Sequence, residues 1–253
     1  MNDILENPFI VFAVSLVAQW LAAYIGDFAR RRARPLRESE QKDLDTVKTA
    51  ILTLLALIIG FSFSMAVTRY DQRKNFEEAE ANAIGTEYAR ADLLPTENAA
   101  HVHELLRRYV DRRIAFYLIR DPPQLSEVDA ETAKLQADLW SAVLSATNTQ
   151  PTPAMALVIS GMNDVLNSQG YTRASWWNRI PGAAWGMMGL IAICCNLLLG
   201  FGERGKSALM PLVLPVIVSI SFFLIADIDS PRGGVILVYP QNLTALSHSI
   251  EAP

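Results

Sequence analysis

The sequence predicts an all-α integral membrane protein with four transmembrane helices and a helical extramembrane domain between the second and the third. Hydrophobic residues make up 51% of the 253 residues, although 19% are charged, and the mean hydropathy is +0.20. The apolar residues gather in four runs, and most charges lie between these runs. Each run has about the length that a helix needs to cross a bilayer. Apolar runs of this length, separated by charged segments, are typical of a multi-pass membrane protein.

The composition also excludes several classes of function. The net charge is −4, and no stripe of lysine and arginine with interleaved aromatic residues occurs, so we expect no nucleic-acid partner. The two cysteines, Cys194 and Cys195, are adjacent within an apolar run, which is typical of reduced, buried small residues. No phosphate-binding glycine loop and no Ser/His/Asp or Cys/His arrangement can be identified, so we expect neither an enzyme nor a cofactor.

The first span is expected at about residues 8–25, and five arginines follow within residues 30–37. The run has no basic segment before it and no A-x-A cleavage site, which predicts a retained anchor. Gln19, Trp20 and Tyr24 near its far end are typical of the membrane interface. The mixed charges that follow predict a short solvated connection with some helix.

The second span is expected at about residues 47–68, so that residues 1–68 hold the first two spans. The helix is expected to continue without a break to Leu94, because Pro95 is the first residue that would end it. Small and polar residues share one face of the span through their helical spacing. Close packing between membrane helices and the lining of a water-filled path both use such a face, and both interpretations stay open. These residues are Thr49, Thr53, Gly60, Ser64 and Thr68.

Residues 69–179 are expected to form the extramembrane domain. Apolar residues at helical spacing predict three helices, which begin at Thr96, at a capping box on Ser126 and near Met155. Gly170 is expected to end the third. The acidic residues Glu77, Glu78 and Glu80 are expected to form a solvated face.

The third and fourth spans are expected at about residues 180–199 and 207–226, followed by an extramembrane tail over residues 227–253. The third span is rich in small residues such as Gly186, which favour close approach of a second helix. Pro215 in the fourth span can kink the helix.

Two charged clusters are expected on the same side of the membrane, because the second and fourth of four spans end on the same side. We expect ion pairs between the clusters, such as Asp227 with Arg69. A pore-mouth role for the arginine is the alternative. Two carboxylates, Asp227 and Asp229, are too few for a calcium site, so no metal is predicted there. The clusters are Arg69, Asp71 and Arg73 after the second span, and Asp227, Asp229 and Arg232 after the fourth.

Three segments carry a resemblance to a known family. Gly60-Phe61 is followed by Thr68-Arg69-Tyr70, which resembles the pore helix of bestrophins. The stretch from Ile59 to Pro95 and the segment from Asp227 to Gly234 resemble a bacterial bestrophin-like membrane family of unassigned function. This second resemblance covers most of the chain.

The resemblance implies a channel for chloride or other small anions, since bestrophins are pentameric anion channels whose second membrane helix lines a hydrophobic neck. Aligned on the Gly-Phe pair, the neck positions are Thr53, Leu57 and Phe61. Thr53 is a departure, because the family has an apolar residue there. Together with Ser64 and Thr68, these are the candidate pore-lining residues.

The two lines of argument imply opposite orientations in the cell (inner) membrane. The arginines within residues 30–37, together with Arg204 and Lys206, predict that both short loops are cytoplasmic. Both termini and the extramembrane domain would then lie outside the cytoplasm. The bestrophin resemblance implies that they lie in the cytosol.

Two functions from different classes are compatible with the sequence. The first is a homo-oligomeric anion channel whose second span lines the path. The second is a non-conducting membrane scaffold or sensor whose helical extramembrane domain binds a ligand or partner.

Overall fold

The computed structural model describes residues 7–149, 152–202 and 210–251, and every regular element in these ranges is a helix. The predicted all-α class is therefore confirmed. Arg204 and Lys206, which the orientation argument uses, and Ser207, where the fourth span was expected to begin, lie outside the described residues.

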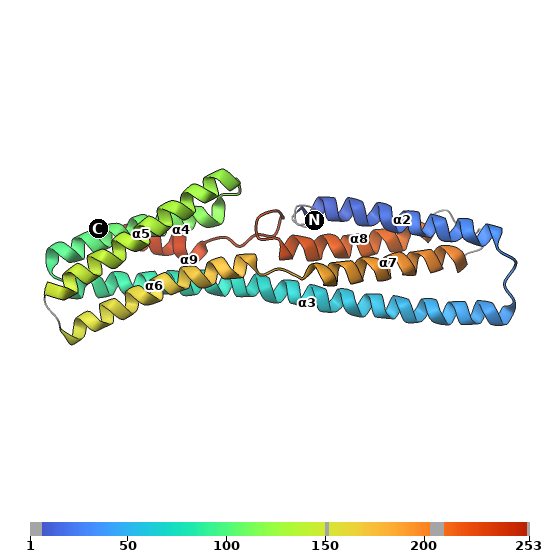
Figure 1. Ribbon diagram of the computed structural model, residues 1–253, viewed down its shortest axis with the longest axis horizontal. Coiled ribbons are helices and arrows are strands. Elements are labelled where there is room, and N and C mark those ends of the chain that lie inside the picture. Colours follow the sequence, from blue (N-terminus) through green and yellow to red (C-terminus); the bar gives the residue numbers. More distant parts are fainter. Residues whose placement is uncertain (1–6, 150–151, 203–209, 252–253) are drawn as a thin grey trace. The chain divides into compact units, whose positions relative to one another are not determined.

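The helices form two compact units, which we describe separately. The membrane unit contains residues 1–70 and 179–237, and the extramembrane unit contains residues 71–178 and 238–253. Helix α3 (Glu38–Arg90) contributes its first part to the membrane unit and its last part to the extramembrane unit (Figure 1).

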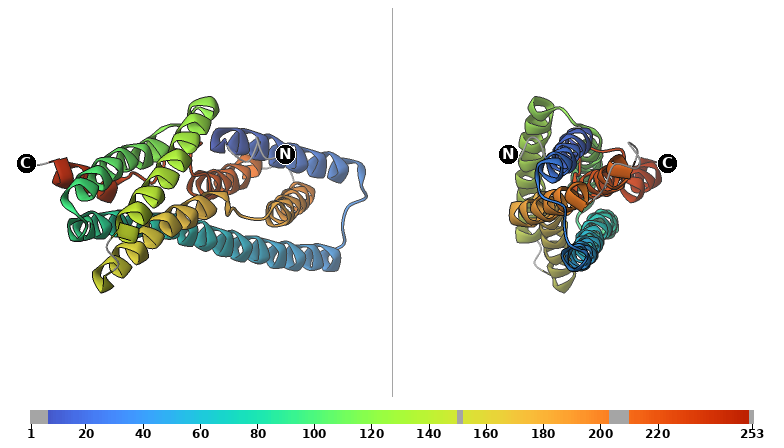
Figure 2. Two further views of the ribbon diagram at one scale, coloured as in Figure 1. Left: turned by 60° about the vertical axis from the view of Figure 1, so that its left-hand side comes forward. Right: turned by 90° about the vertical axis from the view of Figure 1, so that its right-hand side faces the viewer.

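Among the described residues, four helical stretches are long and apolar enough to cross a membrane, as the sequence predicts. Helix α2 begins after Asn7, whose side chain accepts hydrogen bonds from the backbone nitrogens of Phe9 and Ile10. Pro8 is tolerated in the first turn because that position needs no intrahelical donor. Helix α2 packs against α7 and α8 (Figures 1 and 2). The bounds are α2 Pro8–Arg32, α7 Gly182–Gly202 and α8 Met210–Asp229.

Two glycines allow α2 and α7 to meet backbone to backbone. A Cβ atom on Gly26 would collide with the carbonyl of Leu197, and one on Gly200 would collide with the carbonyl of Ala23. Small residues let membrane helices approach in this way. At Gly186, where the sequence suggested a close contact, a Cβ atom would meet nothing within 4 Å. The close approach in α7 is therefore at its last turns.

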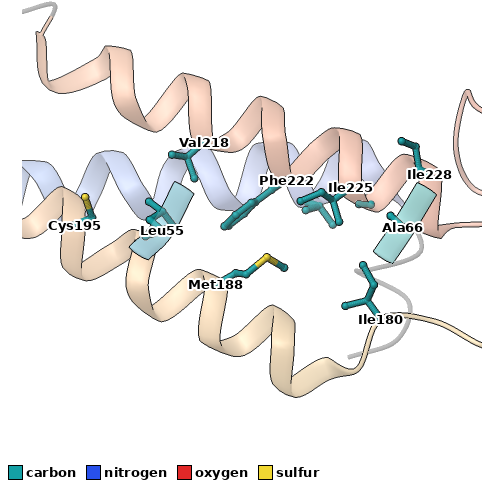
Figure 3. Close-up of a cluster of buried hydrophobic side chains, with 12 residues drawn as sticks. Leu55, Ala66, Ile180, Met188, Cys195, Val218, Phe222, Ile225 and Ile228 are labelled. Atoms are coloured by element: carbon teal, nitrogen blue, oxygen red, sulfur yellow. The ribbon is translucent and has the colours of Figure 1, made fainter. Parts of the chain in front are cut away.

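The apolar core of the membrane unit joins α3, α7 and α8. Figure 3 shows Leu55 and Ala66 from α3, Met188 from α7 and Phe222 from α8 within this cluster, and each is at most 4% exposed. Van der Waals packing, and not the hydrophobic effect, associates helices in a bilayer. This packing assigns one face of α3 to contacts within the chain.

The extramembrane unit is a helical bundle in which α4 packs against α5 and α9, and α5 against α6 (Figure 2). Its core contains Leu106 and Tyr109 from α4 and Leu139 from α5, each fully buried. Helix α9 is the C-terminal helix. The bounds are η1 Ala91–Leu93, α4 Thr96–Leu118, α5 Pro122–Thr149, α6 Pro153–Trp177 and α9 Gln241–Glu251.

Two boundaries in the extramembrane unit differ from the expected ones. Helix α5 begins at Pro122 and not at Ser126, because proline fits the first turn and the Asp121 carboxylate accepts a hydrogen bond of 3.4 Å from the Gln124 nitrogen. Helix α6 continues through Gly170. A glycine inside a helix costs only about 1 kcal/mol, which the burial of Trp176 in the last turn can offset.

Helix α3 also begins earlier than its expected membrane span. It starts at Glu38, and α2 ends at Arg32. Most of the charged stretch over residues 27–45, expected to be a solvated connection, is therefore helical, and only residues 33–37 between the two helices are not. The first turn of α3 has an i,i+4 ion pair of 3.1 Å between Glu38 and Lys42, which favours helix in solvent.

Candidate functional site

One face of α3 is buried within the membrane unit. Leu55 is 1%, Ser62 5% and Ala66 0% exposed. Ser62 follows Leu55 by seven positions and Ala66 follows Ser62 by four, so the three residues lie on one side of the helix. This side faces the core shared with α7 and α8.

The opposite face of α3 carries the candidate pore-lining residues and is exposed. Leu57 is 53% and Phe61 63% exposed, and Thr53, Ser64 and Thr68 are exposed as well. At 100° per residue, these five positions lie on the side of the helix away from Leu55. The structure therefore brings them together on a single stripe, which we call the open face of α3.

Two threonine hydroxyls of the open face donate to the backbone of their own helix. The Thr53 hydroxyl donates to the carbonyl of Thr49 at 2.8 Å, and the Thr68 hydroxyl donates to the carbonyl of Ser64 at 2.9 Å. Because their protons are engaged by the backbone, these threonines present methyl groups and oxygen lone pairs. A Cβ atom on Gly60 would meet nothing within 4 Å, so no other part of the chain packs against the helix at this point.

Arg69 and Asp229 lie together in the membrane unit, Arg69 near the last residue of α3 that belongs to this unit. The two side chains are 15% and 8% exposed, and Arg69 Nη1 lies 3.7 Å from Asp229 Oδ1. The Asp229 carboxylate also accepts a hydrogen bond from the backbone nitrogen of Ile180 at 3.0 Å. These contacts join α3 at Arg69 and the last residue of α8 to Ile180, which precedes α7.

Asp227 organises the turn after α8 instead of pairing with Arg69. Its carboxylate accepts hydrogen bonds from the backbone nitrogens of Val235 at 2.7 Å and Ile236 at 2.9 Å. A Cβ atom on Gly234 would lie 2.8 Å from the Asp227 carbonyl, so the turn needs a glycine there. Among the described residues, no group of three metal-binding side chains occurs.

The other charged residues of the two predicted clusters have different surroundings. Asp71 is exposed, Arg73 is 1% exposed within the extramembrane unit, and Arg232 is partly buried in the membrane unit. The structure thus assigns Arg69 and Arg73 to different units.

A polar network joins three membrane helices and was not foreseen. Gln19 of α2 donates to the Ser219 hydroxyl of α8 at 3.2 Å and accepts from the Asn196 side chain of α7 at 3.0 Å. All three are at most 1% exposed. Such interhelical hydrogen bonds stabilise membrane bundles, so Gln19 has a structural role within the bundle.

The extramembrane unit contains a buried ion pair between α3 and α4. The Arg113 guanidinium donates to both oxygens of Glu80, with Nη2 to Oε2 at 3.4 Å, and the Thr172 hydroxyl of α6 donates to Oε2 at 3.0 Å. Arg113 and Glu80 are fully buried. The Glu80 carboxylate raises the pKa of Arg113 despite the opposing effect of burial.

A second buried carboxylate of α3 holds the C-terminal helix. Glu77 accepts hydrogen bonds from the backbone nitrogen of Leu243 at 2.9 Å and from the Asn242 amide at 2.6 Å. It therefore caps the first turn of α9, where a negative charge is favoured. The expected solvated acidic face is wrong for Glu77 and Glu80, and only Glu78 of the three is exposed.

Comparisons with known proteins agree with this architecture. The Bestrophin-like domain matches residues 10–243. The fold is similar to crystal structures of a bacterial bestrophin homologue from Klebsiella pneumoniae. One, of a point mutant, has a TM-score of 0.65, 17% identity, and coverage of 95% of this chain and 96% of that chain. Another, phased with zinc, has a TM-score of 0.63, 17% identity, and coverage of 96% and 95%.

A further crystal structure, described only as that of a membrane protein with a point mutation, has a TM-score of 0.66, 16% identity, and coverage of 93% of this chain and 94% of that chain. No curated protein matches the sequence at a significant level. The structural likenesses, at 16–17% identity, establish the fold. The match over residues 10–243 establishes the family, and the chain therefore belongs to the bestrophin-like proteins.

Proposed function

We propose that the protein is a homo-oligomeric ion channel in which the open face of α3 lines the path. The observation that supports this proposal is the asymmetry of α3 in the membrane unit. Leu55 and Ala66 are buried on one side, whereas Leu57 and Phe61 are exposed on the other beside Thr53, Ser64 and Thr68. Helix faces directed only at lipid do not require such a stripe of small and hydroxyl-bearing residues.

The permeant ions in this proposal are small anions such as chloride, and the assembly is a pentamer. Both follow from the bestrophin resemblance. Leu57 and Phe61, one helical turn apart, would form the narrowest segment, because rings of large apolar side chains restrict ions by excluding water. Thr53 lies one turn before Leu57 and would widen and wet the path there.

We also propose that the protein lies in the inner membrane with the extramembrane unit outside the cytoplasm. The arginines of residues 30–37 support this orientation through the positive-inside rule. Gln124 is exposed, so a cysteine at this position in a cysteine-free background should react with an impermeant thiol reagent in intact cells. Labelling only after lysis would place the extramembrane unit in the cytoplasm, as the family resemblance implies, and would contradict the proposed orientation.

Flux through reconstituted protein tests the channel proposal. Purified protein in chloride-loaded liposomes should release chloride faster than empty liposomes, because an assembled path bypasses the lipid barrier. Chloride efflux is measured with a halide electrode at several pH values, with and without calcium. Oligomers that are intact in the same liposomes but give only the leak of empty liposomes would contradict the proposal.

A ligand sensor is the second candidate, favoured by a cavity of about 320 Å³ in the extramembrane unit. The cavity lies between α4 and α5, and charged groups of both signs surround it. Such a lining suits a small ligand that carries both charges. Binding of a zwitterionic amino acid by protein that gives no flux would favour this candidate. The charged lining residues are Arg108, Asp111, Arg112, Glu131, Lys134 and Asp138.

A further inference from the structure

Glu87 is a carboxyl group buried in the extramembrane unit. It lies on the last turn of α3, in the extramembrane unit, and is 0% exposed. Among the residues that the structure describes, neither of its carboxyl oxygens has a hydrogen-bond partner. The other buried carboxylates of α3 differ: Glu77 accepts hydrogen bonds from α9, and Glu80 from Arg113. An unsatisfied group of this kind needs an explanation, because buried polar groups are normally paired.

Helix α6 covers Glu87 at a glycine. A Cβ atom on Gly161 would collide with Glu87 Oε2 and would lie 2.5 Å from Nη1 of Arg90. Arg90 itself donates to the Leu157 carbonyl of α6 at 3.4 Å. The α6 backbone therefore lies directly on the Glu87 carboxyl, and no side chain of α6 separates them at this point.

Burial acts on Glu87 more strongly than the charges around it. Burial raises its pKa to about 8, while Arg90 of α3 acts to lower it and Asp164 of α6 to raise it. Removing a carboxylate from water disfavours its charged form unless an opposite charge compensates. Two charged groups of the adjoining η1 and α4 have contacts of their own: Asp92 Oδ1 lies 3.5 Å from His103 Nε2, and Arg107 donates to the Ile250 carbonyl at 3.1 Å.

We propose that Glu87 is the proton-binding group of a switch in the extramembrane unit: protonated, it lets α6 pack on α3 at Gly161, and ionised, it separates the two helices there. The neutral carboxyl is compatible with contact against the α6 backbone. The carboxylate requires water or a cation, and both need space that α6 occupies. The proposal concerns the extramembrane unit and holds whether or not the protein conducts ions.

The direction of the pH effect follows from the two states. With α6 packed, Glu87 binds its proton up to about pH 8, and once hydrated it has the ordinary pKa of 4.5. The separated state therefore loses the proton first as the pH rises. The ratio of separated to packed molecules should increase about tenfold per pH unit between 4.5 and 8, and should level off above 8.

Distance measurement between α3 and α6 tests the switch. Spin labels are placed on cysteines at Ala89 and Ser160, both exposed, in the full chain in lipid nanodiscs after Cys194 and Cys195 are replaced by alanine. From about pH 5 to 9, the long-distance population should grow and then level off above about pH 8. Glu87→Gln keeps a neutral side chain of the same shape and should remain packed at every pH.

Glu78→Gln is the matched control, because Glu78 is an exposed glutamate of the same helix. This variant should respond to pH as the parent protein does. Distance distributions of the parent that are the same at the two ends of this pH range would overturn the proposal. An unchanged pH response in Glu87→Gln would also overturn it, since the proton would then bind elsewhere. Thermal unfolding provides a second measurement: Glu87→Gln should stabilise the protein more at about pH 8 than at about pH 5.

Discussion

Replacing Arg113 by methionine should lower the free energy of unfolding of the extramembrane unit by about 3–5 kcal/mol. The substitution leaves the Glu80 carboxylate fully buried without its cation, and an uncompensated buried charge is among the most destabilising changes known. Thermal unfolding in detergent, followed by tryptophan fluorescence, measures the loss.

Two further variants identify the cause of this destabilisation. Adding Glu80→Gln to Arg113→Met should recover part of the loss, because the unpaired charge is then removed. Arg112→Met is the matched control, since Arg112 forms a pair of 2.9 Å with Glu131 in which the side chains are 42% and 48% exposed. Exposed pairs contribute about 1 kcal/mol or less. Equal losses for Arg112→Met and Arg113→Met would contradict the role of the buried pair.

Replacing Phe61 by alanine should increase chloride flux through reconstituted protein by about tenfold. The smaller side chains would widen the constriction formed by Phe61 of all subunits, and a tenfold increase corresponds to a barrier to ion passage that is lower by about 1.4 kcal/mol. Phe61 is 63% exposed on the open face of α3, so its loss leaves the core of the chain intact. Halide efflux per intact oligomer is the measurement.

Leu55→Ala provides the control for Phe61→Ala. Leu55 belongs to the same helix but is 1% exposed and packs in the core. This variant should lower thermal stability, because truncating a buried leucine leaves a cavity, without increasing flux. If Phe61→Ala lowered stability and left flux unchanged, Phe61 would be a packing residue.

The fold could be predicted because its main signals are local. Apolar runs of bilayer length indicate the spans, and the helical spacing of Thr53, Leu57 and Phe61 indicates a shared face. Whether that face is open or packed is a tertiary property. The structure shows that the packed face carries Leu55 and Ala66, which have no special pattern in the sequence.

The buried charges could not be predicted, because their partners are distant in the chain. Glu80 and Arg113 are 33 positions apart, and nothing local indicates that they meet. A weaker signal was present in α3: Arg73, Glu77, Glu80 and Glu87 follow the helical phase of the apolar residue Ile84. Charges in phase with an apolar stripe indicate burial, whereas Glu78 is out of phase and exposed.

Cysteine modification on the two sides of α3 tests the central claim most directly. Ser64 is exposed on the open face, and Ser62 is 5% exposed on the buried face two positions away. In liposomes of a Cys194→Ala, Cys195→Ala background, a charged thiosulfonate reagent should block chloride flux through Ser64→Cys and leave Ser62→Cys unaffected. Block of neither variant, or equal block of both, would contradict a path lined by the open face of α3.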